Sequence, residues 1–169
     1  CSLEYGLYGL DKPKNAMKIN SNIMEELKLQ SSQRLLIVGE ALRQGKTIEE
    51  IHAVTKYDKW FIKQIYDLVN LEKILADSKL DKNLILLAKK NGFSDKKISS
   101  LLRITENEVR EFRNKHEINP VYRLVDTCAG EFKSKTPYLY STYDWEFENT
   151  KFCEAKPTSN KKVLILGGG

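Results

Sequence analysis

The sequence predicts a mainly α protein: a compact bundle of short helices with an internal helix-turn-helix-like repeat, followed by an extended C-terminal segment. Three observations support this fold class. Between about residues 21 and 117, amphipathic runs alternate with N-cap residues and glycine stops. Part of this pattern recurs later in the chain at a constant offset. Asn119-Pro120 then ends the helical region, and aromatic and β-branched residues follow it.

The first two predicted helices have clear start and stop signals. Asn22 can cap a first helix that carries Ile23 and Leu27 on one face. A second helix runs from about residue 33 through "RLLIVGEALRQ" and ends at Gly45, which can adopt the left-handed conformation that closes a helix. These signals predict two helices packed through their apolar faces.

Three further helices follow in the first part of the chain. Thr47 and Glu50 form a capping-box pattern at the start of a short amphipathic helix. Asp58 caps the next helix, and "NLILLAKK" forms a fifth that stops at Asn91-Gly92. The apolar stripe expected on the helix after Asp58 contains Phe61, Ile65, Leu68 and Val69.

The region that starts at Gly45 repeats itself, because Gly92 follows Gly45 by 47 residues and six further positions match at the same spacing. The first copy contains Gly45, Thr47, Ile51, Val54, Asp58, Ile62 and Ile65. Their counterparts are Gly92, Ser94, Ile98, Leu101, Thr105, Val109 and Phe112. Periods of this size indicate paired helices that stack around a shared core. Two copies are too few for an open solenoid, so we expect a compact domain.

The second copy also fits a helix-turn-helix DNA-binding motif, in which a longer basic helix enters the major groove. Its candidate base-reading and phosphate-contacting residues are Arg110, Arg113 and Lys115. Two features argue for helix pairs that only pack. The first copy carries Trp60, Phe61 and Tyr66 at the reading positions, and Glu106, Glu108 and Glu111 crowd the face that would approach phosphate. Both interpretations stay open at this point.

The segment after the helices is rich in aromatic residues, including "YLYSTY", which favours a strand or an extended segment. Its clustered aromatic residues are Tyr122, Tyr138, Tyr140, Tyr143 and Trp145. A tyrosine has one apolar side and one hydroxyl, which suits an interface. We therefore expect this segment to lie against another surface.

Composition argues against several classes of function. The net charge is +5, but 22 of the 28 cations are Lys and are spread along the chain, which is typical of solvated helix faces and not of a nucleic-acid partner. No run of residues is long and apolar enough to span a membrane, so no membrane partner is predicted. Cys1, Cys128 and Cys153 are odd in number and scattered, which favours a cytoplasmic location. No signal-peptide pattern opens the chain. Because the chain starts on Cys and not on Met, we expect its N-terminus to be cut.

The sequence signals for catalytic and ligand-binding residues are weak. Cys128 beside Asp126-Thr127 could be a nucleophile with His116 as base, but a structural cysteine next to a capping pair explains the pattern better. The two histidines lack metal-ligand spacing, so no metal site is predicted. Gly167, Gly168 and Gly169 follow a predicted strand, 163–166, but the helix that would hold a phosphate does not follow them. We expect no catalytic residue and no bound cofactor.

Several segments, taken in chain order, resemble the large chain of carbamoyl-phosphate synthase. They are "SLEYG", "YDKWFIKQIYDLVNLE", "GFSDKKISSLLRITENEVREFR", "PVYRLVDTCAGEFKSKTPYLYSTYDWE" and "KVLILGGG". Cys1 and Gly130 depart from the family pattern, which has a basic residue and an alanine there. The similarity covers essentially the whole chain and assigns it to the region between the two ATP-grasp halves of that enzyme.

The resemblance implies a role as a scaffold. The parent enzyme makes carbamoyl phosphate from bicarbonate, glutamine-derived ammonia and ATP, with Mg or Mn, for arginine and pyrimidine synthesis. A glutaminase small subunit supplies the ammonia, and the large chains form homo-oligomers. Without the ATP-grasp cores, this chain is expected to be inactive alone and to link the halves.

The resemblance also implies boundaries and contact residues. Residues 1–15 would be the tail of the first synthetase half, 16–150 the oligomerisation domain with the tyrosine-rich segment, and 151–169 a linker and the first strand of the second half. Exposed apolar positions are the interface candidates: Ile23, Leu27, Tyr138, Tyr140 and Tyr143.

Overall fold

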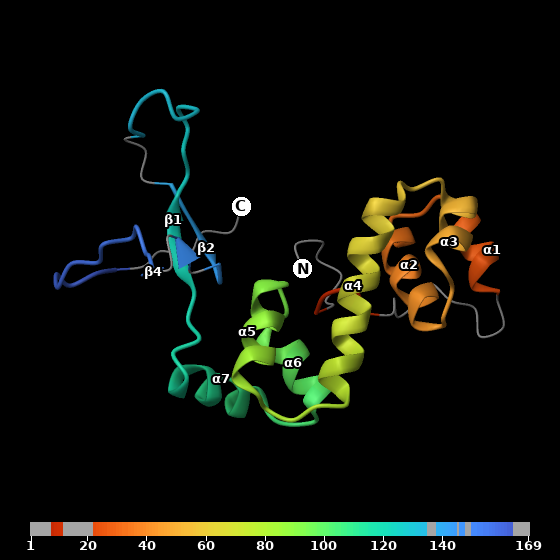
Figure 1. Ribbon diagram of the computed structural model, residues 1–169, viewed down its shortest axis with the longest axis horizontal. Coiled ribbons are helices and arrows are strands. Elements are labelled where there is room, and N and C mark those ends of the chain that lie inside the picture. The colour runs from red at the N-terminus through yellow and green to blue at the C-terminus, as the bar shows by residue number, and fades with distance from the viewer. Residues whose placement is uncertain (1–7, 12–21, 135–137, 145, 148–149, 164–169) are drawn as a thin grey trace. The chain divides into compact units, whose positions relative to one another are not determined.

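A computed structural model describes residues 8–11, 22–134, 138–144, 146–147 and 150–163 (Figure 1). The chain divides into two compact units, Cys1–Ile118 and Asn119–Gly169, and each is considered by itself. The predicted mainly α class is confirmed, because the first unit is built from helices and the strands of the second unit are short. The predicted domain boundaries after residues 15 and 150 stay predictions.

The first unit contains seven helices in its described part (Figure 1). They are α1 (Ile23–Lys28), α2 (Arg34–Arg43), α3 (Ile48–Thr55), α4 (Lys59–Ala76), α5 (Lys82–Lys90), α6 (Asp95–Leu102) and α7 (Glu106–Lys115). In Figure 1 α4 runs between α1–α3 on one side and α5 and α6 on the other. Helix α4 packs against α2, α3 and α6 and therefore joins the early helices to the later ones.

The predicted start and stop signals are confirmed at the level of single hydrogen bonds. Thr47 and Glu50 form a reciprocal capping box on α3, and Asp58 accepts from the backbone N–H of Trp60 at 2.7 Å. Asn22 caps α1 by accepting from the N–H of Met24 at 3.0 Å. Local sequence therefore decides where these helices begin, because each cap satisfies an amide that would otherwise lack a partner.

The internal repeat is present in the backbone and extends further than the sequence pattern indicates. Helices α3 and α6 begin and end at residues 47 apart, as do the starts of α4 and α7 and the last residues of α2 and α5. Gly45 and Gly92 have φ of 85° and 81°, and the C-caps Lys56 and Arg103 have φ of 59° and 58°. We call α2, α3 and the first part of α4 the first copy, and α5, α6 and α7 the second copy.

The buried positions of the two copies also correspond. The buried pairs are Val38 and Ile85, Ala41 and Ala88, Ile51 and Ile98, Ile62 and Val109, and Leu71 and Ile118. Each of these side chains is at most 5% exposed. Burial of paired apolar residues is what holds a stacked helical repeat together, so the predicted compact helical domain is confirmed.

Two predictions of exposure within this unit are wrong. Ile23 and Leu27 were expected to be exposed on the first helix, but they are 4% and 0% exposed and belong to the core formed with α2, α3 and α4. The apolar face of so short a helix is needed for its own packing. Phe61 was expected in the buried stripe of α4, but Ile62 takes that place and begins the 62, 65, 69 period.

The second unit is built on an antiparallel hairpin of β1 (Val121–Leu124) and β2 (Leu139–Thr142), with Val121 opposite Thr142 and Leu124 opposite Leu139. Two shorter strands, β3 (Glu146–Phe147) and β4 (Thr150–Lys151), pair with each other. Residue Glu154 lies along β1: its N–H donates to the carbonyl of Tyr122 and its carboxylate accepts from the N–H of Leu124. The predicted extended segment is therefore confirmed.

Candidate interaction surfaces

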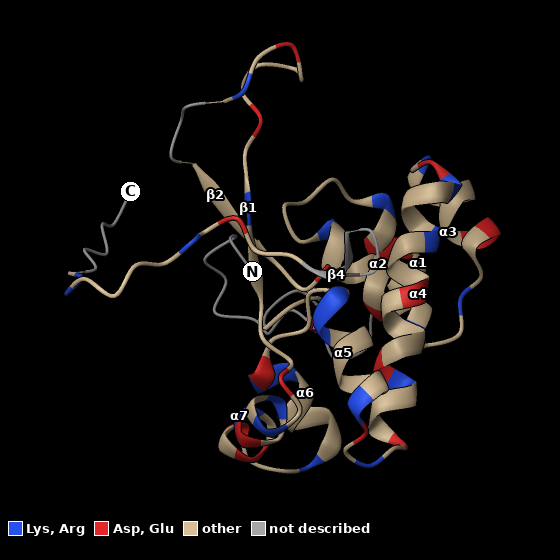
Figure 2. Cartoon of the chain, turned by 60° about the vertical axis from the view of Figure 1, so that its left-hand side comes forward, with Lys and Arg blue, Asp and Glu red and all other residues tan. Residues whose placement is uncertain are grey.

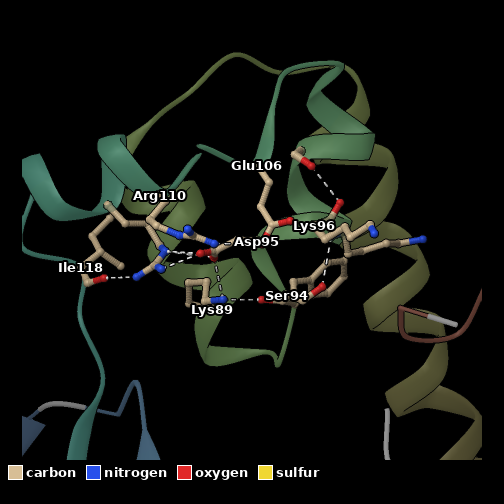
Figure 3. A network of polar contacts seen from close by, with 11 residues as sticks. Lys89, Ser94, Asp95, Lys96, Glu106, Arg110 and Ile118 are labelled. Carbon is tan, nitrogen blue, oxygen red and sulfur yellow. Dashed lines mark hydrogen bonds and ion pairs between the residues drawn. The ribbon is translucent and has the colours of Figure 1, made fainter. Parts of the chain in front are cut away.

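A buried ionic triad holds the second copy together (Figure 3). Asp95 at the start of α6 accepts from Lys89 of α5 at 2.9 Å and from Arg113 of α7, with 2.9 Å to Nε and 2.5 Å to Nη2. The side chain of Lys89 is 9% exposed, and those of Asp95 and Arg113 are each 11% exposed. Arg113 also donates to the carbonyl of Ile118, and Lys89 to that of Phe93. The triad therefore ties three helices and the chain exit after α7 into one group.

The protonation of Asp95 follows from these contacts. Burial alone would raise the pKa of Asp95, but the hydrogen bonds from Arg113 and Lys89 and their positive charges outweigh it and lower the pKa. The carboxylate is therefore ionised at neutral pH and can accept all of these bonds. Both cations also donate to backbone carbonyls, so each is held by more than one contact.

A second ionic network joins the two copies to the segment of residues 8–11. Glu72 of α4 accepts from Arg43 of α2 at 2.8 and 3.0 Å and pairs with Lys97 of α6 at 3.0 Å. Arg43 also donates to the carbonyl of Leu10, and Lys97 pairs with Asp11. Burial alone would lower the pKa of Arg43, but the hydrogen bonds and charge of Glu72 outweigh it and raise the pKa.

A small cleft borders this network. It has a volume of about 200 Å³ and is lined partly by Tyr8, Leu68, Phe93 and the paired Glu72 and Lys97. The two charged groups of its wall are bonded to each other and to neighbouring residues. The cleft therefore lies between residues 8–10, α4 and the start of α6, and the charged groups in its wall are held in ion pairs.

Two of the three candidate DNA-reading residues are engaged in intramolecular contacts. Arg113 lies in the buried triad, and Arg110 pairs with Glu106 at 3.2 Å on the same helix. Figure 2 shows acidic and basic residues interspersed along α4 and α7. Since a DNA-binding helix needs cations available for phosphate and base edges, the second copy gives no support to the DNA-binding alternative.

The residues weighed as a nucleophile and a base have local structural roles. The N–H of Cys128 donates to Asp126 Oδ1 at 2.9 Å, as expected for a cysteine beside a capping aspartate. The ring of His116 lies 4.3 Å from that of Phe112 at the end of α7. His52 Nδ1 is 2.7 Å from the carbonyl of Tyr57. Each group therefore has a structural contact near its own position in the chain.

Two aromatic side chains at the start of α4 are exposed to solvent. Trp60 and Phe61 are each 61% exposed, and their rings meet edge to face with centroids 5.0 Å apart. We call these two residues the aromatic pair. They were considered in the sequence only as positions of a DNA-reading helix and as part of a buried stripe, and the structure supports neither assignment.

Exposed aromatic residues also gather on the hairpin of the second unit. Tyr138 and Tyr140 are 62% and 53% exposed, Tyr122 is 44% exposed, and Tyr143 is half-buried. Along β2, Leu139, Tyr140 and Ser141 are all exposed, so both faces of this strand are open to solvent. The tyrosine interface candidates are therefore accessible, whereas Ile23 and Leu27 are not.

The remaining site predictions concern ligands. Gly167, Gly168 and Gly169 lie outside the described residues, and Val163, the first residue of the predicted strand, is 90% exposed and outside any strand. In the described ranges, His, Cys, Asp and Glu do not gather into any group that could hold a metal ion. None of the described helices combines the length and apolar character needed to cross a membrane.

The chain is similar to known proteins along nearly its whole length. Residues 1–117 match the family described as carbamoyl-phosphate synthetase large chain, oligomerisation domain. The chain is 46% identical to a carbamoyl phosphate synthase large chain from Neisseria meningitidis serogroup A, 43% to one from Pseudomonas aeruginosa and 41% to one from Vibrio cholerae. Each match covers 99% of this chain and 15%, 16% and 15% of the respective relative. The chain therefore spans about 15% of the length of these curated relatives.

Proposed function

Because the chain belongs to the oligomerisation-domain family of the carbamoyl-phosphate synthetase large chain, we propose that it is a scaffold within that large chain. In this role it links the carboxyphosphate and carbamoyl-phosphate synthetase halves and takes part in association of large chains with one another. The chain itself supplies no catalytic residue.

The observation that carries this proposal is that charged side chains pair between helices while aromatic side chains lie exposed on the surface. In the first unit, Asp95 and Glu72 each bind cations from other helices, which ties those helices together. The large side chains that remain open to solvent include the aromatic pair on α4 and the tyrosines of the hairpin, beside aliphatic residues such as Leu29 and Ile74. A body tied together in this way, with exposed aromatic residues, is suited to holding other domains.

The low stability expected of an isolated hairpin also supports a scaffold role. An isolated two-stranded sheet is marginally stable in water, and β2 is open on both faces. Packing of Tyr138, Tyr140 and Tyr143 against another domain of the large chain would bury this surface. We propose that the second unit makes such a contact and so helps to hold the two synthetase halves in register.

The activity belongs to the larger polypeptide under this proposal. The large chain, with a glutaminase small subunit, would make carbamoyl phosphate from bicarbonate, glutamine-derived ammonia and ATP with Mg or Mn, in the cytoplasm, for arginine and pyrimidine synthesis. Fixed geometry between the two halves matters in such a reaction because reactive intermediates must reach the second site before water destroys them.

Two measurements test the proposal. Sedimentation velocity should show that the full-length large chain loses self-association when Cys1–Ile118 is deleted. The chain alone should give no ATP-dependent turnover with bicarbonate and ammonia. Unchanged association after the deletion would count against the oligomerisation role, and turnover by the chain alone would count against the scaffold role.

A further inference from the structure

The aromatic pair lies on a rigid part of the fold. Trp60 and Phe61 occupy the first turn of α4, whose start is held by the Asp58 cap at 2.7 Å from the N–H of Trp60. The next residue, Ile62, is fully buried. The two rings are therefore presented to solvent by an anchored helix, and a partner would not have to order a loop to bind them.

The internal repeat shows that the fold does not require these aromatic side chains. At the same positions of the second copy, α7 carries Asn107 and Glu108. Helix α7 still begins at the matching residue and still buries Val109, the counterpart of Ile62. Glu108 even completes a capping box with Thr105. The first copy thus forgoes a capping glutamate where it exposes Phe61, which points to a role outside local folding.

We propose that the aromatic pair is the docking point for another domain of the same large polypeptide, a partner that offers an apolar socket and a hydrogen-bond acceptor for the indole Nε1–H. This inference rests on the proposed function, since it assumes that the chain works inside the large chain. Tryptophan is the side chain most typical of such anchors, because it buries a large area and retains one polar group.

The charges around the pair favour a near-neutral partner. Lys63 pairs with Asp67 at 2.5 Å one turn further along α4, and Lys59 lies 3.8 Å from Glu49 of α3. The cations that border the aromatic rings are therefore balanced by carboxylates. A strongly charged partner such as a nucleic acid would gain little here, whereas an apolar socket would be matched.

The size of the patch favours a tethered domain over a second copy of the chain. Two aromatic side chains expose about 250 Å² at this degree of burial, whereas a stable contact between separate proteins needs about 800 Å² per partner. A domain in the same polypeptide is held nearby at high effective concentration, so a small anchor suffices. The relatives are far longer than this chain, which covers 15% of one of them, so such domains have room in their length.

Hydroxyl-radical footprinting of the full-length large chain and of this chain, each at two concentrations, tests the proposal. We expect oxidation of Trp60 and Phe61 to be about fivefold slower in the full-length protein, as for a desolvated anchor, and unaffected by dilution. Equal oxidation in both proteins would overturn the proposal. Protection that disappears on dilution would also overturn it and assign the patch to contacts between copies.

A variant that copies the second repeat separates docking from folding. Trp60→Asn with Phe61→Glu introduces the residues that α7 already carries, so this chain should keep its helical content and thermal midpoint. In the full-length protein we expect faster proteolysis between domains, by about tenfold for loss of an anchor. The control is Ile74→Gln, at an apolar position on α4 that is 53% exposed, which should leave proteolysis unchanged.

The outcomes remain separable from those of the proposed function. If proteolysis of the double variant matched that of the control, the docking role would be wrong even if deletion of Cys1–Ile118 abolished self-association. If the double variant behaved as expected while that deletion had no effect, the docking role would stand and the oligomerisation role would fall.

Discussion

The two copies of the helical repeat have the same backbone plan and matching buried apolar pairs, but they differ in chemistry at three corresponding positions. The second copy uses the triad of Lys89, Asp95 and Arg113, all nearly buried. At the matching positions the first copy carries Leu42, Ile48 and Tyr66. Leu42 belongs to the apolar core and Ile48 packs against it. At these positions the second copy therefore has nearly buried ion pairs, whereas the first copy has two apolar side chains in or against the core and Tyr66, which is 38% exposed.

The difference shows which features specify the repeat. Caps, the left-handed helix stops and the buried apolar pairs occur in both copies. The three triad positions, in contrast, carry charged residues in one copy and uncharged residues in the other. An ion triad depends on its geometry, because each buried charge needs a partner, whereas an apolar cluster tolerates small shifts. The second copy should therefore be the more sensitive of the two to single substitutions.

The largest effect is expected from Asp95→Ala. The substitution leaves Lys89 and Arg113 buried without their shared carboxylate, which should lower the free energy of unfolding by about 3–5 kcal/mol. Urea unfolding followed by circular dichroism measures this. The matched control is Glu106→Ala, which breaks an exposed ion pair and should cost less than about 1 kcal/mol. Equal costs for the two variants would contradict the structural role of the triad.

A smaller net change is expected when the whole triad is replaced by the first-copy set, Lys89→Leu, Asp95→Ile and Arg113→Tyr. No buried charge is left unpaired, so we expect a free energy of unfolding within about 2 kcal/mol of the wild type, well above that of Asp95→Ala. Unfolding of the triple and single variants in parallel decides this. A triple variant less stable than Asp95→Ala would show that the second copy requires ions.

Acid should weaken the second copy through Asp95. Its pKa is lowered in the folded state, so the ionised group stabilises the fold fully above its ordinary pKa of about 3.9, and this contribution is lost as pH falls through the folded-state value. Between those values the unfolded chain binds more protons, and stability rises with pH. Measured below about pH 4, the slope should be shallower in Asp95→Asn than in the wild type. Identical slopes would argue against this assignment.

The smallest effect concerns Gly39 in α2, where the second copy has Leu86. A Cβ at Gly39 would meet Leu10 and Arg43 at 3.6–3.7 Å, which is ordinary contact distance. We therefore expect Gly39→Ala to raise the free energy of unfolding by up to about 1 kcal/mol, through helix propensity. Gly39→Leu should lower it by displacing residues 8–11. Thermal unfolding of both variants measures these changes. If Gly39→Leu raised the stability, the placement of Leu10 beside Gly39 would be contradicted.

Several features of the fold could be predicted because they depend on neighbours in the chain. A cap requires only a hydroxyl or carboxylate a few residues from a backbone amide, as Thr47 and Thr105 show. The repeat was visible because glycines, caps and apolar positions recur at one spacing. The triad also left a signal: aligning the copies places charges opposite the apolar residues Leu42 and Ile48, which indicates that those charges are buried together.

Other features depended on which surfaces meet in space. The sequence could not show that Ile23 and Leu27 are buried in the core. A short amphipathic helix has the same apolar pattern whether its apolar face packs inside its own domain or against a partner. Phe61 and Ile62 are adjacent and similarly apolar, and the stripe expected on α4 included Phe61, although the repeat aligns Ile62 with Val109 and Phe61 with Glu108; in the structure Ile62 is the buried residue. The link of Glu72 to Arg43 and Lys97 joins residues far apart in the chain.

By itself, the sequence determined the helical class, the helix limits, the repeat and the membership of the family, because each of these is encoded by local pattern or by similarity along the chain. The tertiary structure alone decided which apolar residues are core and which are surface, and which charges pair. Those outcomes follow from packing, where burial of an apolar face and desolvation of a charge depend on residues brought together from distant parts of the chain.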